Sequence, residues 1–133
     1  GAHVDIVQKA GRFDLSFQQD GLLRPLSQAE LSDGTLRYLL WIAALLTPRP
    51  PELMVLNEPE TSLHPELLPP LGRLMKKCAE STQLWVISHA HGLIDALSEE
   101  SNHVHLTKRL GETMIEGLGT LDFETPAWKW PVR

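Results

Sequence analysis

The sequence predicts an α/β fold, in which helices cover a parallel sheet and a small antiparallel β element lies near the N-terminus. Two short apolar runs, residues 53–56 and 83–88, are separated by an amphipathic helical segment, which is the pattern of a strand-helix-strand unit. The first run does not alternate and is closed by Pro59, so we expect a strand buried on both faces. Residues 12–18 alternate between apolar and polar side chains, as a half-buried antiparallel strand does.

The other elements follow from turn signals and helical spacing. Prolines 48, 50 and 51 separate the first predicted helix from the strand at residues 53–56, because proline cannot continue a helix. Near the N-terminus we expect a turn at residues 20–21 and a returning strand over residues 22–26. We expect three helices: one that begins near residues 32–33, one over about residues 67–80 and one over residues 92–97. Strands over residues 103–107 and 113–118 should flank a turn at residues 110–111, and residues 126–133 should form a tail packed on the surface.

Composition limits the class of protein. The 133 residues suit one domain or part of one, and 42% hydrophobic with 22% charged residues is typical of a soluble globular chain. No apolar run approaches the ~20 residues that span a membrane, so no membrane partner is expected. A net charge of −5 does not indicate nucleic-acid binding by this segment, although a longer protein could contact DNA elsewhere. Because Cys78 is the only cysteine, we expect a reducing, cytoplasmic location.

Polar residues follow both predicted parallel strands. Asn57 and Glu58 end the first strand, and His89 follows the second. In open α/β sheets, ligands gather at the carboxyl ends of the strands. The sequence therefore predicts an amide, a carboxylate and an imidazole at one edge of the sheet.

A second polar group opens the first predicted helix. Ser32 or Asp33 can cap it, and the free N–H groups of a helix N-terminus suit an anion such as phosphate. We expect the small Gly34, next to Thr35, to let another molecule approach the first turn closely.

The order of these motifs resembles the C-terminal half of an ABC-type ATPase, closest to the RecF, SMC and OLD-nuclease branch of predicted AAA-family ATPases. Over residues 12–118, LSDGT looks like the signature loop, LMVLNE like the Walker B strand, TSLHP like the D-loop and the histidine after Ser88 like the switch histidine. The resemblance implies a P-loop NTPase fold with ATP and Mg²⁺ as cofactors, and a second ATPase protomer that completes a head-to-tail ATP sandwich.

The resemblance also implies a role for each matching residue. Glu58 would orient and deprotonate the attacking water, and His89 would donate a hydrogen bond to the γ-phosphate and sense its loss. The signature loop would bind the nucleotide held by the second protomer, and the D-loop would connect the two sites. The implied nucleotide-binding residues are Ser32, Asp33, Gly34, Thr35, Ser62 and His64.

Two departures from the family pattern affect these expectations. Asn57 stands where an aspartate is usual, so it would reach magnesium only through a bound water and without negative charge. The P-loop pattern G-x-x-x-x-G-K-[ST] is absent, since no lysine follows a glycine. We therefore expect residues 1–133 to be one partial domain, the C-terminal portion of a longer ATPase, that neither binds ATP tightly nor hydrolyses it alone.

We expect that partial domain to have three parts: a β-rich lead-in over residues 1–30, the motif-bearing core over 31–100, and terminal strands with a tail over 101–133. In the ATPases that this chain resembles, the P-loop strand lies inside the sheet. Without it, one edge of the strand over residues 84–87 would be open, so we expect either that later strands pair with it or that two copies associate through it.

Two alternatives belong to other classes. His89 with His91, and His103 with His105, could form a zinc site of a metal-dependent hydrolase, although no cysteine or fixed carboxylate accompanies them at a characteristic spacing. The other alternative is a noncatalytic module that regulates a partner ATPase. An upstream P-loop would favour the enzyme over the module.

Overall fold

The computed structural model describes residues 1–109 and 111–116, and the chain divides into compact units of residues 1–100 and 101–133. The first unit begins with an antiparallel sheet of β1 (Ala2–Lys9), β2 (Arg12–Gln19) and the short β3 (Leu26–Ser27). Ala10 and Gly11 connect β1 and β2 with positive φ angles, as a two-residue hairpin turn requires. The strand over residues 12–18 is confirmed. The returning strand is limited to β3, since Pro25 cannot donate to a ladder, and β1 was not anticipated.

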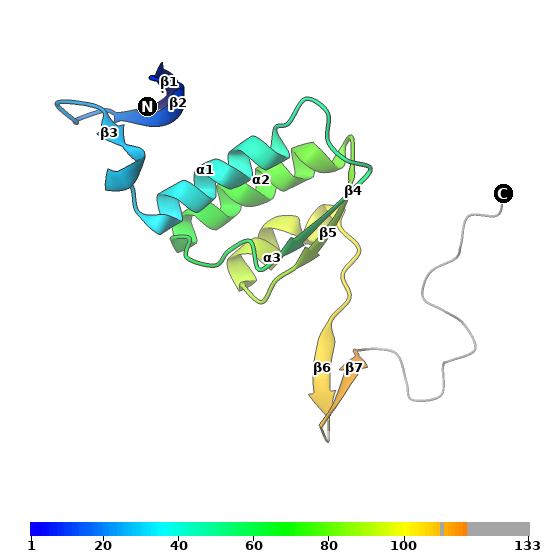
Figure 1. Ribbon diagram of the computed structural model, residues 1–133. Coiled ribbons are helices and arrows are strands. Elements are labelled where there is room, and N and C mark those ends of the chain that lie inside the picture. The colour runs from blue at the N-terminus through cyan, green and yellow to red at the C-terminus, as the bar shows by residue number, and fades with distance from the viewer. Residues whose placement is uncertain (110, 117–133) are drawn as a thin grey trace. The chain divides into compact units, whose positions relative to one another are not determined.

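The rest of the first unit alternates helices and strands (Figure 1). The elements in order are the 3₁₀ turn η1 (Gln28–Glu30), α1 (Asp33–Leu45), β4 (Leu53–Asn57), η2 (Pro65–Leu67), α2 (Leu68–Ala79), β5 (Gln83–Ile87), α3 (His91–Leu97) and η3 (Ser98–Glu100). Prolines 69 and 70 lie in the first turn of α2, where their missing N–H groups have no intrahelical acceptor. The predicted helices and both predicted parallel strands are therefore present within a few residues of their expected bounds.

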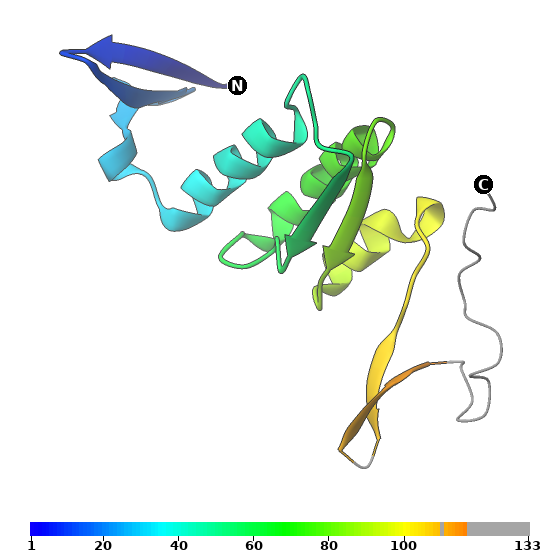
Figure 2. The same cartoon turned by 45° about the vertical axis from the view of Figure 1, so that its right-hand side comes forward.

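Strands β4 and β5 run parallel and side by side (Figure 2). Their register pairs Leu53 with Gln83 at one end and Asn57 with Ile87 at the other. The residues that follow both strands, Glu58 and Ser88, therefore leave the sheet at the same edge.

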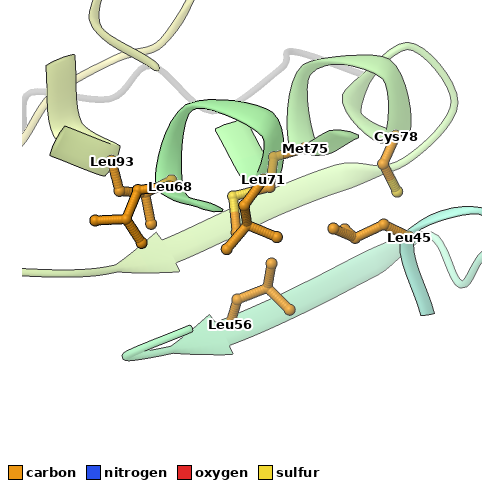
Figure 3. Close-up of a cluster of buried hydrophobic side chains, with 7 residues drawn as sticks. All are labelled: Leu45, Leu56, Leu68, Leu71, Met75, Cys78 and Leu93. Atoms are coloured by element: carbon orange, nitrogen blue, oxygen red, sulfur yellow. The ribbon is translucent and has the colours of Figure 1, made fainter. Parts of the chain in front are cut away.

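Helices cover one face of this sheet with a continuous apolar core. Leu56 of β4 points toward Leu71 and Met75 of α2, and Leu45, at the end of α1, closes the cluster (Figure 3). Leu71, Met75 and Leu93 are almost completely buried, and each contributes about 1.5–3 kcal/mol of burial free energy. The full cluster consists of Leu45, Leu56, Leu68, Leu71, Met75, Cys78 and Leu93.

The opposite face of the sheet is open, which corrects the expectation that the strand over residues 53–56 is buried on both faces. Val55 is 57% exposed and Trp85 is 62% exposed, while their strand neighbours Leu56 and Val86 face the helices. An uninterrupted apolar run does not reveal which face lacks a cover, because alternate side chains point to opposite sides of a strand.

The second unit contains an antiparallel hairpin of β6 (Leu106–Arg109) and β7 (Glu112–Ile115). The strand expected over residues 103–107 begins only at Leu106, and residues 110 and 117–133, including the predicted tail, lie outside the described residues. Within the described chain, β5 pairs with β4 alone and β6 with β7 alone. The pairing of later strands with β5, one of the two outcomes expected, is therefore not found among the described strands.

None of the helices that the structure describes combines the length and the apolar character needed to cross a membrane.

Candidate functional site

The N-terminus of α1 is capped by Ser32. The Oγ of Ser32 accepts a hydrogen bond from the Thr35 backbone N at 3.2 Å and lies 2.9 Å from the Thr35 hydroxyl. Ser32 itself has extended backbone angles, as an N-cap residue does. Of the two predicted caps, the structure selects Ser32, and Asp33 is the first helical residue.

Gly34 gives α1 a close contact with another segment of the same chain. A Cβ atom built on Gly34 would lie 2.5 Å from the carbonyl oxygen of Ser62, far inside van der Waals contact. The Ser62 backbone therefore occupies the space that a side chain at this position would need. Ser62 has a φ of +66°, a left-handed conformation that is uncommon outside glycine.

One cavity joins the two sequence motifs. It has a volume of about 360 Å³ and is lined by Ser32, Asp33, Gly34, Thr35, Ser62, His64 and Leu67. All of the residues predicted to bind nucleotide therefore lie around one space, although TSLHP follows LSDGT by more than twenty residues in the sequence. The Nδ1 of His64 accepts from the Glu66 backbone N at 3.3 Å, which fixes the ring at the start of η2.

Side chains of α1 hold the loop that follows β4. The indole N–H of Trp41 donates to the Pro59 carbonyl at 2.9 Å, and a guanidinium N–H of Arg37 donates to the Thr61 carbonyl at 3.4 Å. Together with the Gly34 contact, these bonds anchor residues 59–62 along one side of the helix. Neither Arg37 nor Trp41 was singled out from the sequence.

The segment that leads into α1 is fixed by Glu30. Its carboxylate accepts from both terminal nitrogens of Arg24, at 2.6 and 3.1 Å, and from the backbone N of Ser27 at 3.0 Å. The hydrogen bonds from Arg24, followed by those from Ser27, lower the pKa of Glu30 to about 2. Glu30 therefore stays ionised at neutral pH, and its bonds to Arg24 and Ser27 fix the segment that precedes Ser32.

Glu58 lies directly after β4 in a strained conformation. Its φ is +46°, and its backbone N donates to the Ile87 carbonyl at 2.8 Å. Glu58 and Asn57 are both exposed, so their side chains are accessible to a ligand at the edge of the sheet. Backbone strain of this kind costs about 1–3 kcal/mol and is common at functional sites.

Glu60 was not predicted as a site residue, although it is the buried acid of this region. Its side chain is only 7% exposed, and its Oε1 accepts from the Ser88 hydroxyl at 2.7 Å and the His89 backbone N at 3.0 Å. Burial alone would raise the pKa of the Glu60 carboxyl, but the bonds from Ser88 and the backbone outweigh burial and lower it. No sequence signal distinguishes Glu60 from the exposed glutamates around it.

His89 lies next to Glu60 with most of its ring in solvent. The ring is 78% exposed, and its Nδ1 is 3.5 Å from Glu60 Oε1. The structure thus places His89 at the same sheet edge as Glu58. Among residues 1–109 and 111–116, no three His, Cys, Asp or Glu side chains lie close enough to hold a metal ion, so this part of the chain gives the zinc alternative no support.

The strand ends, the capped helix and the loop between them belong to an α/β domain, and comparison with known proteins identifies its class. The sequence profile of the family described as "AAA domain, putative AbiEii toxin, Type IV TA system" matches residues 3–95. The chain belongs to this family, which lies within the P-loop AAA/ABC-type ATPases.

A solved structure also resembles the chain. It comes from work described as "Structural biochemistry of ATP-driven dimerization and DNA stimulated activation of SMC ATPases", with a TM-score of 0.73 and 14% sequence identity. The similarity covers 90% of this chain and 74% of that chain, and at this identity it shows a shared fold. No curated protein matches the sequence.

Proposed function

We propose that this chain is the C-terminal portion of an ATP-hydrolysing AAA/ABC-type ATPase of the RecF, SMC and OLD-like branch. The observation that carries the proposal is the cavity that unites Ser32 to Thr35 with Ser62 and His64. It combines a helix N-terminus with hydroxyl groups, which suits the phosphates of a nucleotide. The family match and the shared fold support the same class.

The described residues fit one side of an ATP site. The N–H groups of the first turn of α1 and the hydroxyls of Ser32 and Thr35 would hold a terminal phosphate presented by a second protomer, in the head-to-tail arrangement. The open face of β4 and β5 fits the same interpretation, since the part of the domain that carries the P-loop would cover it. ATP brings the transferable phosphoryl group, and this chain's residues orient and activate the water.

Glu58 is the proposed general base. It is exposed at the carboxyl end of β4, and the bond from its backbone N to Ile87 fixes its position beside the end of β5. A carboxylate there would orient the water and accept its proton as it attacks the γ-phosphate. His89, at the end of β5, would contact the same phosphate.

Asn57 would act on magnesium through a bound water. It is exposed at the last position of β4 and offers an amide oxygen that can accept a hydrogen bond from that water. Since it carries no charge, Asn57→Asp in the full-length protein should hold or raise the magnesium-dependent rate. A large fall would assign the amide another role.

The decisive experiment replaces Glu58 with glutamine in the full-length protein. Glu58→Gln should lower kcat for ATP hydrolysis by at least about 100-fold while ATP binding is retained, because the variant loses the base but keeps the shape. The control is Glu52→Gln, which removes an exposed carboxyl just before the other end of β4 and should leave kcat unchanged. Normal hydrolysis by Glu58→Gln would refute the assignment of the base.

A further inference from the structure

Glu60 connects the two strand ends that carry the proposed catalytic residues. Its Oε1 accepts from both the Ser88 hydroxyl and the His89 backbone N. The Ser88 oxygen in turn accepts from the Ala90 backbone N at 3.1 Å, so the turn from β5 into α3 is held by a chain of hydrogen bonds that ends on Glu60.

Backbone hydrogen bonds also hold Glu58 at the end of β5. The Glu58 backbone N donates to the Ile87 carbonyl at 2.8 Å, and the Thr61 backbone N donates to the Glu58 carbonyl at 3.1 Å. The segment of Glu58 to Glu60 is thus tied to the end of β5 at two points, one through the backbone and one through the Glu60 carboxylate. The distance between the Glu58 and His89 backbones therefore depends on both of these connections.

The Glu60 carboxylate also lies near one nitrogen of the His89 ring. Nδ1 lies 3.5 Å from Glu60 Oε1, while the ring as a whole is exposed. A carboxylate accepts and cannot donate, so it favours a proton on the nitrogen that faces it. The neutral ring then offers Nε2 as an acceptor, so His89 donates to a phosphate oxygen only when Nε2 is protonated as well.

The burial of Glu60 is not explained by stability alone. Its side chain is only 7% exposed, and its Oε2 is buried. Burying a carboxylate costs free energy, which an apolar residue at this position would avoid. The arrangement therefore favours a role for the carboxylate in placing other groups.

We propose that Glu60 is a positioning residue, which fixes His89 relative to Glu58 and holds the proton of the neutral His89 ring on Nδ1. The positioning of His89 relative to Glu58 rests on the proposed ATPase function. The tautomer of His89 can be measured whether or not the protein hydrolyses ATP. Glu60 needs no contact with the nucleotide for this role.

The kinetic test compares two substitutions in the full-length protein. Glu60→Ala removes the acceptor, so kcat should fall by about 10- to 100-fold with KM changed by less than about threefold. Glu60→Gln keeps an oxygen that accepts from Ser88 and His89, so its kcat should stay within about threefold of wild type. Glu52→Ala, at an exposed glutamate away from these contacts, should match wild type.

Two outcomes would contradict the positioning role: a wild-type kcat for Glu60→Ala, or a loss of activity in Glu60→Gln as large as that in Glu60→Ala. A rise in KM as large as the fall in kcat would also oppose it, because a residue that only supports the fold or the binding site would give that pattern.

The second readout is the tautomer of the neutral His89 ring, measured in long-range ¹H–¹⁵N spectra at about pH 8.5. The wild type should carry the proton on Nδ1, and Glu60→Ala should shift it toward Nε2. A wild-type ring protonated on Nε2 would refute the proposal, even if Glu60→Ala does not fold. If the wild type hydrolyses no ATP, the proposed function fails, and the tautomer still decides whether Glu60 controls His89.

Discussion

Gly34 and Gly92 each occupy the second position of a helix, but their surroundings differ. A Cβ on Gly34 would lie 2.5 Å from the Ser62 carbonyl oxygen, whereas a Cβ on Gly92 would lie at an ordinary 3.5 Å from a methyl group of Leu68. Of these two glycines, only Gly34 is therefore required by packing. The same substitution at the two sites separates that packing effect from the general effect of removing a helical glycine.

Gly34→Ala should destabilise the protein by about 1–3 kcal/mol, because backbone atoms of α1 and the Ser62 loop must move apart. Gly92→Ala should be neutral or stabilising by about 0.4–1 kcal/mol, since alanine restricts the unfolded chain without a clash. Urea unfolding of both variants measures the difference. Equal losses of stability would contradict the close contact between Gly34 and Ser62.

Glu60 should make stability depend on pH in the acid range. The pKa of its carboxyl is lowered in the folded protein, so the unfolded state binds the proton more tightly. The stabilisation is complete above the unfolded pKa of about 4.3 and is lost as the pH falls through the lower folded value.

The urea midpoint of the wild type should therefore fall more steeply between about pH 5 and pH 3 than that of Glu60→Gln, which cannot titrate at this position. Glu52→Gln is the control, because its exposed carboxyl lies away from these hydrogen bonds, and its profile should follow the wild type. Parallel profiles for Glu60→Gln and wild type would show that the carboxyl is not held by Ser88 and His89.

The residue-scale predictions from the sequence succeeded where the cause is local. The Ser32 cap depends only on its own first turn. The contact of Gly34 with Ser62 and the burial of Glu60 depend on segments that are distant in sequence or turned inward by the fold. Such contacts leave no periodic signal in a single sequence.

At the scale of elements, Gly72 sets how closely α2 approaches α3. A Cβ on Gly72 would lie 2.8 Å from the Cβ of Ala96, so the two small residues meet at the crossing of the helices. Helices that pack this closely do not tolerate an added methyl group without moving apart.

Gly72→Ala should therefore cost about 1–3 kcal/mol of unfolding free energy, even though alanine is the better helix former. Ala96→Gly in the Gly72→Ala background should recover part of that loss, because it removes the opposing methyl group. A double-mutant cycle by urea unfolding measures the coupling between the positions. Strictly additive effects would mean that the helices do not meet at this pair.

The type of each long element was predictable, whereas its environment was not. Helical spacing and proline positions located α1, α2 and α3, and the apolar runs located β4 and β5. The second strand of the N-terminal hairpin was expected from alternation, but β1 was not. The hairpin turn at Ala10 and Gly11 lacks the Asn-Gly or Asp-Gly signal that would have revealed it.

In the part of the chain that the structure describes, helices cover only one face of the two-stranded sheet of β4 and β5. Its other face exposes Leu53, Val55, Trp85 and Ile87. Neighbouring apolar side chains on one surface normally mark a place that another surface covers. In the proposed full-length ATPase the P-loop part of the domain is that cover.

Residues 1–133 expressed alone should therefore self-associate through this face and through the edge of β5 that pairs with no described strand, where backbone groups can pair with another strand. Sedimentation velocity should show weight-average mass rising with concentration. Val55→Lys with Trp85→Lys should move association to concentrations at least about tenfold higher, since charge on the face opposes burial. Leu23→Lys, at a fully exposed leucine outside this sheet, is the control and should leave association unchanged. Unaltered association of the double variant would show that copies meet through another surface.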